Sequence, residues 1–460
     1  MLLGTKNELE QVLAQALASG GDFAEVFLER RWSSSVGLED ERVERVHSGL
    51  DQGAGIRLLA GEGSIYVYTN DISASGLLRA ATDAATALEH RFLEPKKLTL
   101  SVKNRKKNDA RLNDFGVDLA VELVQAANKG ARLASDKVRQ VMVRYRSLDQ
   151  KIQIANSLGN LVSDYHSRNT LIVHVVAADG GTVQTGYESL GSYNDYSMFT
   201  KDKAVEMATV SARRALILLE ARPAPAGRMP VVLAGEAGGT MIHEACGHGL
   251  EADIVGKGMS VYAGKLGKQV ASKLVTVVDD PTLSGKYGSY TYDDEGTPAQ
   301  KTVLIRNGIL ENYLYDLNWA RRHGVKPTGN GRRQSFQFRP IPRMSNTYLA
   351  AGTTPPGDII MATENGLLVK RMGGGQVNPA TGDFVFEVAE GYVIKDGRVA
   401  YPVRGATLTG NGSKVLLAVD LVGTDLGFAI GTCGKDGQGV PVSDAQPTIR
   451  IPDLVVGGVL

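Results

Sequence analysis

Apolar side chains recur at helical spacing near the start of the chain. Residues 9–17 place Leu, Val and Ala on one helix face, and Gly20-Gly21 then forms a typical stop signal. Residues 23–30 have the pattern of a strand, residues 33–69 that of short strands separated by glycine turns, and residues 138–187 that of several antiparallel strands. Further apolar periodicity predicts helices at about residues 75–89, 117–135 and 203–220.

A proline-rich segment separates this first half from a half of different character. Residues 221–230 contain prolines that cannot continue a helix. Beyond them glycine is frequent, and Asn307-Gly308 and Asp396-Gly397 predict type I′ hairpin turns. We therefore expect an α+β protein: an N-terminal α/β domain of antiparallel strands and helices at residues 1–222, and a mostly antiparallel, barrel- or sandwich-like β domain at residues 230–460. The second domain carries the helix of the candidate metal site described below.

Composition narrows the classes of protein and partner. The chain has 460 residues, enough for two or three domains, and 51 basic side chains balance 50 acidic ones. A surface that binds nucleic acid usually has a basic excess. Such an excess occurs only around Lys96 to Arg111, where Asn and Asp are interspersed in a pattern typical of a solvated loop. We therefore expect no nucleic-acid partner.

Cysteine content and hydropathy indicate a compartment. Cys246 and Cys433 are the only two cysteines, too few for a disulfide framework and suited to a reducing environment. Residues 1–10 lack the basic-then-apolar pattern of a signal peptide. No uncharged apolar run reaches the roughly 18 residues that span a bilayer. The sequence therefore predicts a cytoplasmic protein without a membrane partner.

The strongest chemical signal is His243-Glu244-Ala-Cys-Gly-His248. Two neutral imidazoles bind Zn²⁺, and a glutamate beside them can take a proton from a water at the metal. The alternative, two histidines with ordinary hydrogen bonds, is weaker because the chain has only seven histidines. The motif therefore predicts a metallohydrolase site.

The spacing of the histidines demands a local irregularity. His243 and His248 are five residues apart, which places them about 140° apart on a regular helix. A π-bulge would bring both onto a common face, and such bulges often mark functional sites. Gly247 and Gly249 make the distortion less costly.

Two histidines require a third protein ligand, and the residues alone leave several candidates open. Cys433 lies between small residues in Gly-Thr-Cys-Gly and is the strongest of them. Cys246 lies three residues after His243 but is equally typical of a buried apolar position. Glu251 and Asp253 are possible ligands or groups that orient the histidines.

Several long motifs, in order, resemble the TldD/PmbA family of bacterial and archaeal metallopeptidases, and most closely its TldD branch. The resemblance covers most of the chain and is strongest after residue 233. It is carried by the segments His243–Asp253, Gly373–Phe386, Pro402–Thr407 and Cys433–Gln438.

The resemblance implies a site, an activity and partners. His243, His248 and Cys433 would bind one zinc ion per chain, Glu244 would be the catalytic base, and Cys246 would have no metal role. The implied activity is hydrolysis of short or unfolded peptides. The implied assembly is a homodimer or a heterodimer with a PmbA-like subunit. The PmbA-like branch lacks this metal set, whereas this sequence retains all four residues.

The sequence leaves two other functions possible, and it leaves two features near the motifs with more than one interpretation. The chain could be a non-catalytic partner subunit of a peptidase dimer, or a thiol hydrolase that uses Cys246. Gly373–Gly375 could let an extended peptide approach and pair with an edge strand, or could form a tight loop. Lys435 could tune the Cys433 thiolate or lie in solvent.

Overall fold

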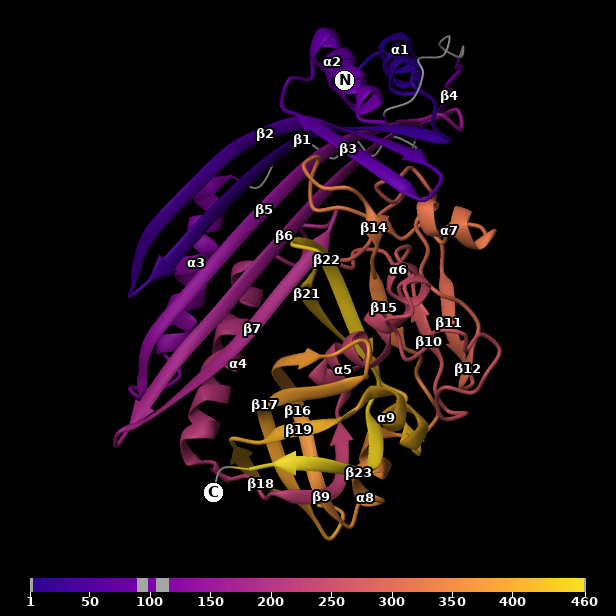
Figure 1. Ribbon diagram of the computed structural model, residues 1–460. Helices are drawn as coiled ribbons and strands as arrows, with labels where there is room; N and C mark the ends of the chain where they lie inside the picture. The colour runs from indigo at the N-terminus through magenta and orange to yellow at the C-terminus, as the bar shows by residue number, and fades with distance from the viewer. Residues whose placement is uncertain (1–2, 89–97, 105–115, 459–460) are drawn as a thin grey trace.

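A computed structural model describes residues 3–88, 98–104 and 116–458 of the chain. A long, curved antiparallel sheet with four helices forms the N-terminal part, and smaller sheets form the C-terminal part beside it (Figure 1). The predicted α+β class is confirmed. Residue 89 of the second predicted helix and most of the basic segment, residues 96–97 and 105–111, lie outside the described residues.

The N-terminal sheet has seven strands in the order β3-β2-β1-β5-β6-β4, with β7 paired to β6. All pairs are antiparallel except that of β4 with β6. The strands are β1 (Phe23–Glu39), β2 (Arg42–Ala60), β3 (Gly63–Thr69), β4 (Ser101–Asn104), β5 (Val138–Asn156), β6 (Asn160–Asp179) and β7 (Thr182–Tyr193).

Helices pack on this sheet through the apolar faces that the sequence predicts. The helix α1 begins with a capping box in which the Thr5 hydroxyl accepts a hydrogen bond from the Glu8 backbone and the Glu8 carboxylate accepts one from the Thr5 backbone. Apolar side chains of α1 and α2 share one buried cluster with the sheet, and those of α3 and α4 share a second. The bounds are α1 (Lys6–Ala16), α2 (Ala74–Thr86), α3 (Val117–Arg132) and α4 (Lys201–Glu220).

The expectation of short strands over residues 33–69 is wrong. The strand β1 runs for 17 residues and β2 for 19, so Gly37, Gly49, Gly53 and Gly55 lie inside strands, whereas Gly61 does lie in a turn. A Cβ atom on Gly53 would lie 2.2 Å from the Phe336 ring, and one on Gly55 would lie 1.9 Å from the Tyr66 hydroxyl. These glycines let the C-terminal part of the chain pack against the sheet, a role that local sequence does not indicate.

The C-terminal part contains a closed five-stranded barrel, which confirms the barrel-like alternative. Strands follow one another as β16-β9-β23-β19-β17, and β17 pairs back with β16. The two predicted hairpins are confirmed, with positive φ at both turn residues of each. The barrel strands are β9 (Gly227–Leu233), β16 (Asn365–Val377), β17 (Asp383–Lys395), β19 (Thr407–Asn411) and β23 (Ile449–Gly457), extended by β8 (Arg222–Pro223), β18 (Arg398–Arg404) and β20 (Leu421–Val422).

A second, six-stranded sheet lies beside the barrel in the order β12-β11-β10-β15-β22-β21, which leaves β21 at its edge. Its strands are β10 (Val277–Asp279), β11 (Thr302–Arg306), β12 (Ile309–Leu310), β15 (Asn346–Leu349), β21 (Gly427–Lys435) and β22 (Gln438–Gln446). The remaining elements are the ribbon of β13 (Gly331–Arg332) and β14 (Ile341–Pro342) and the helices α6 (Ala252–Gly256), α7 (Leu317–His323), α8 (Pro356–Met361) and α9 (Gly412–Ala418).

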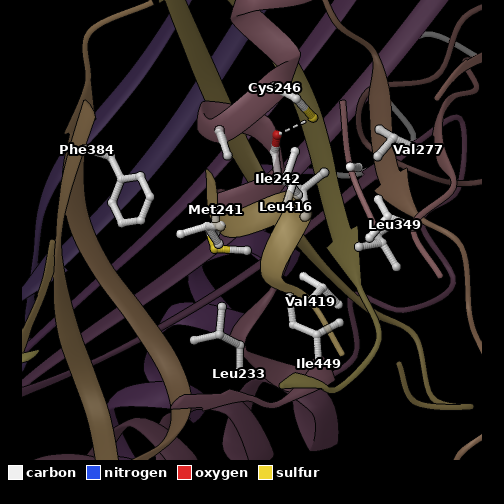
Figure 2. Packing of buried hydrophobic residues seen from close by; sticks show 14 of the residues in the cluster. Leu233, Met241, Ile242, Cys246, Val277, Leu349, Phe384, Leu416, Val419 and Ile449 are labelled. Carbon is white, nitrogen blue, oxygen red and sulfur yellow. Dashed lines mark hydrogen bonds between the residues drawn. The ribbon is translucent and has the colours of Figure 1, made fainter. Parts of the chain in front are cut away.

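One buried cluster joins the barrel, the second sheet and the short helices between them. Figure 2 shows Met241, Ile242 and Cys246 packed among side chains from both sheets and from α9. Because Met241 and Ile242 immediately precede His243, this packing anchors the start of the predicted metal motif.

Buried charges connect the N-terminal sheet to the C-terminal part. An Arg57 Nη atom lies 3.0 Å from a Glu25 oxygen and 2.6 Å from a Glu295 oxygen, and Arg333 also pairs with Glu25. The boundary predicted between residues 222 and 230 stays a prediction. Within the described ranges, no helix combines the length and apolar character that crossing a membrane requires.

Candidate metal centre

The expected irregularity in the histidine motif is confirmed. After β9 the chain forms a short 3₁₀ turn, the helical turn α5 (Thr240–Ile242), a π-helical turn (His243–Gly247) and a second 3₁₀ turn (His248–Leu250). The His248 backbone N–H donates to the His243 carbonyl, a hydrogen bond that spans five residues. The two imidazole rings consequently meet edge to face, with centroids 5.0 Å apart.

The edge strand β21 brings Cys433 to these histidines. The Nε2 atoms of His243 and His248 lie 3.1 and 3.3 Å from the Cys433 Sγ atom. In the described part of the chain, only these three residues form a group of His, Cys, Asp or Glu side chains whose potential ligand atoms all lie within 4.8 Å of one another. Two segments about 190 residues apart in the sequence therefore converge on one point.

The geometry of these three atoms fits a bound metal ion. Zinc bonds of about 2.0 Å to nitrogen and 2.3 Å to sulfur, in a tetrahedral arrangement, separate nitrogen and sulfur by about 3.5 Å. The observed separations are slightly shorter. Both histidines present Nε2 to the thiol and keep Nδ1 for other partners, so no ring must turn to accept an ion.

Carboxylates hold the Nδ1 atoms of both rings. Asp444, from β22, places an oxygen 2.7 Å from His243 Nδ1, and Glu251 places one 3.0 Å from His248 Nδ1. A carboxylate on the remote nitrogen fixes the tautomer and orientation of a ligating histidine. Of the open alternatives, Glu251 is therefore placed as an orienting group.

A buried lysine completes this arrangement. Lys435 Nζ lies 3.0 Å from Glu251 and 2.6 Å from Asp253, and it donates to the Pro342 carbonyl. Its side chain is 9% exposed, which excludes the alternative that it lies in solvent. Asp253 contacts Lys435 rather than a histidine, and it lies outside the group of candidate ligands.

The electrostatics favour a thiolate at Cys433. Burial by itself would raise the pKa of this thiol, but His243 and His248 outweigh burial and lower the pKa to about 5. Burial would lower the pKa of His248, whereas Glu251 and Cys433 raise it to about 9. A thiolate is the form that coordinates metal, and a metal ion would replace the protons shared with the rings.

Cys246 has the opposite environment. It is fully buried, its Sγ donates to the Ile242 carbonyl at 3.2 Å, and burial raises the pKa of its thiol to about 12 (Figure 2). A protonated thiol with no access to solvent is neither a nucleophile nor a ligand at neutral pH. The hypothesis of a thiol hydrolase at Cys246 therefore has no structural support.

Glu244 lies at the wall of an open cleft. The cleft has a volume of about 510 Å³ and is lined by the three candidate ligands, by Glu244 and by most of β21. Burial raises the pKa of Glu244, while the neighbouring histidines partly oppose that rise. A carboxylate with a raised pKa can both accept and return a proton near neutral pH.

Gly373–Gly375 belong to a strand rather than a loop, and Gly374 and Gly375 are exposed. They lie inside β16, where the pairing with β17 slips, and a Cβ atom on Gly375 would lie 1.8 Å from the Phe386 ring. The expectation of a tight loop is therefore wrong. The residues that follow, Gln376 and Val377, line the cleft opposite β21.

Sequence reasoning overlooked two residues of the site. Asp444 is a single carboxylate in an otherwise largely apolar strand, and this exception to the strand pattern was the available signal. Arg343 is fully buried and donates to the Cys433 carbonyl, with its Nε atom 3.9 Å from Glu251. No local motif distinguishes it from other arginines.

Comparison with known proteins identifies the family of the chain. Three family models match the chain: domain 1 of the PmbA/TldA metallopeptidases at residues 24–88, their central domain at 110–219 and their C-terminal domain at 226–458. The chain belongs to this family. The third match includes the whole candidate metal centre of this PmbA/TldA chain.

Relatives of this PmbA/TldA chain are similar over nearly their whole lengths. Proteins named metalloprotease TldD homolog from Buchnera aphidicola and Haemophilus influenzae are each 36% identical, covering 95% of this chain and 93% of the relative. A metalloprotease from Methanothermobacter thermautotrophicus is 35% identical over 95% of this chain and 96% of its own length.

Solved structures share the fold at lower identity. TldE from Thermococcus kodakarensis has a TM-score of 0.77 at 18% identity, covering 98% of this chain and all of that chain. A Thermotoga maritima protein described as a candidate modulator of a DNA gyrase has a TM-score of 0.79 at 22% identity, with the same coverage. At these identities the likeness concerns the fold alone.

Proposed function

We propose that this protein is a zinc-dependent peptidase that hydrolyses short or unfolded peptides. The observation that carries the proposal is the convergence of His243, His248 and Cys433 at one point of an open cleft that also holds Glu244. The names of the relatives support a metalloprotease. Two imidazoles and one thiolate favour zinc among the common divalent metals.

His243, His248 and Cys433 would hold the zinc ion, and Asp444 and Glu251 would keep both rings in the binding tautomer. When bound, zinc supplies a Lewis acid that favours attack of water on the scissile carbonyl. Glu244 takes a proton from the attacking water and then delivers it to the leaving amine nitrogen. Partial burial raises the pKa of the Glu244 carboxyl, which favours its role in both proton transfers.

The edge strand β21 gives a binding mode for an extended chain. It pairs with β22 on one side only, and most of its residues are partly exposed. A peptide added to such an edge is held through backbone hydrogen bonds, which tolerate many sequences but exclude folded substrates. Because Cys433 belongs to the same strand, the added peptide would lie beside the metal centre.

The assembly is a separate part of the proposal. We propose a dimer, either of two copies of this chain or with a PmbA-like subunit, as the family resemblance implies. Light scattering on the purified chain gives its mass. A monomer that cleaves peptides fully would contradict an obligatory dimer, whereas a zinc-loaded chain that cleaves only after a second subunit is added would support the heterodimer.

A Glu244→Gln variant tests the peptidase directly. The amide keeps the shape but cannot accept the proton, so cleavage of an unstructured fluorogenic peptide should fall by about 10² to 10⁴-fold. Zinc content should stay at the parent value, and Glu364→Gln, an exposed change far from the cleft, should leave cleavage unchanged. Parental cleavage by Glu244→Gln would contradict the mechanism. Zinc-loaded parent protein that cleaves nothing would favour the non-catalytic partner subunit.

A further inference from the structure

The N-terminal sheet has one face covered by helices and one face without a helix. Val143 and Tyr145 of β5 point into the cluster formed with α3 and α4. Arg144 and Arg146 alternate with them and are exposed, because successive side chains of a strand lie on opposite faces. We call the face that bears these two arginines the open face.

Strand register arranges the open face in two rows that cross five strands. In the first row Arg146 lies opposite Thr170 on one side and Ser35 on the other. In the second, Arg144 lies opposite Ile172 and Gly37. The complete rows, from β7 to β2, are Gly191-Thr170-Arg146-Ser35-His47 and Ser189-Ile172-Arg144-Gly37-Arg45.

The first row begins at the metal cleft. A Cβ atom on Gly191 would lie 2.7 Å from Ile430 Cδ1, so the sheet touches β21 there, and Ile430 also lines the cleft. Arg146 is two strands away, or about 10 Å at the usual strand spacing. Along β21, Ile430 and Cys433 are three residues apart, which adds about 10 Å. An extended peptide needs about six residues to span this path.

Three arginines of this face have no ion-pair partner in the described part of the chain. Arg45, Arg144 and Arg146 line a hollow of about 460 Å³. Among the described residues, none of the three makes a side-chain hydrogen bond or an ion pair. Glu39 and Glu44 line the same hollow, and Glu39 accepts a hydrogen bond from Gln140 at 2.7 Å.

We propose that the open face is an exosite that binds an acidic segment of the peptide whose scissile bond lies at the metal centre. The inference rests on the proposed function and adds a preference to it. Three unpaired guanidinium groups complement carboxylates, and Thr170 and Gly191, between them and the cleft, offer no competing charge. Glu39 and Glu44 in the same hollow, together with the balanced overall charge, disfavour a long polyanion such as a nucleic acid as occupant.

The test measures binding without cleavage. Two fluorescent peptides share one unstructured sequence, but one ends in a block of glutamates and the other in glutamines. In a Glu244→Gln background, anisotropy should show the glutamate peptide bound about tenfold more tightly, because three exposed charge pairs each add a modest attraction. The preference should weaken as salt is raised.

Charge reversal then locates the preference. We expect the double variant Arg144→Glu with Arg146→Glu, and separately the variant Arg45→Glu, to lose the tighter binding of the glutamate peptide. Binding of the glutamine peptide should be unaffected. The matched control, Arg213→Glu with Arg398→Glu, changes two exposed arginines away from the open face. It should still bind the glutamate peptide more tightly than the glutamine peptide.

Three outcomes would overturn the exosite. The first is a parent protein that binds both peptides equally, and the second is a preference that persists in the charge-reversed variants. The third is a change in the mass of the protein in solution on charge reversal, which would make the face a subunit interface. None of these readings depends on cleavage, so failure of the exosite is distinct from failure of the peptidase.

Discussion

At the scale of single residues, the candidate metal centre depends on groups that would not themselves contact a metal ion. Asp444 and Glu251 each hold one histidine, and Lys435 balances the charge of Glu251. The sequence was sufficient to predict His243 and His248, because a paired-histidine motif is local. It could not identify Asp444 as the partner of His243, because this contact exists only once β22 lies beside the π turn.

Asp444→Asn should weaken zinc binding about 10 to 100-fold while leaving the fold intact, because the amide keeps the shape but loses the charge that orients His243. Competition with a chromophoric chelator measures the affinity. Asp358→Asn, an exposed change in α8, is the control. Equal zinc affinity in parent and Asp444→Asn would mean that this carboxylate has no part in positioning the histidine.

At the scale of elements, the four helices of the N-terminal part were predictable because each has an apolar face, whereas the short helices α6 to α9 of the C-terminal part were not predicted. The full length of the long strands was not predictable, because glycines such as Gly53 resemble turn residues until the side chain packed against them is known. The π turn was predictable for a different reason: two histidines five residues apart can share a ligand only if the helix is distorted.

Gly412→Ala tests how closely α9 packs against the π turn. A Cβ atom there would lie 2.6 Å from the Ala245 carbonyl oxygen and 2.7 Å from its Cα, so backbone must move. We expect a loss of about 1 to 3 kcal/mol in unfolding free energy, seen as a lower melting temperature. Gly357→Ala, where a Cβ meets nothing within 4 Å, should not lower it. Equal melting temperatures for both variants would refute close packing at Gly412.

At the scale of the whole molecule, the N-terminal sheet and the C-terminal part are joined by charges that neither segment reveals alone. Arg57 lies between Glu25 and Glu295, and all three side chains are at most 2% exposed. Nothing in the sequence around β2 indicates a partner more than 200 residues away. The path from the open face to the cleft likewise exists only because the N-terminal sheet packs against the C-terminal part.

Arg57→Ala would leave two carboxylates buried with less compensation. Such a change costs about 3 to 5 kcal/mol of unfolding free energy. Urea unfolding followed by the fluorescence of Trp32 and Trp319, one in each half of the chain, should show it. Arg79→Ala removes an exposed pair with Asp71 and should cost about 1 kcal/mol or less. A similarly small cost for Arg57→Ala would contradict a structural role for the buried network.

The central claim is that His243, His248 and Cys433 form one metal site. Zinc content per chain, measured by elemental mass spectrometry on the parent and on Cys433→Ser after equal exposure to zinc, tests it most directly. We expect about one zinc per parent chain and a marked loss in Cys433→Ser, because the serine hydroxyl is a far weaker ligand than a thiolate. A parent that takes up no zinc, or a variant indistinguishable from it, would contradict the claim.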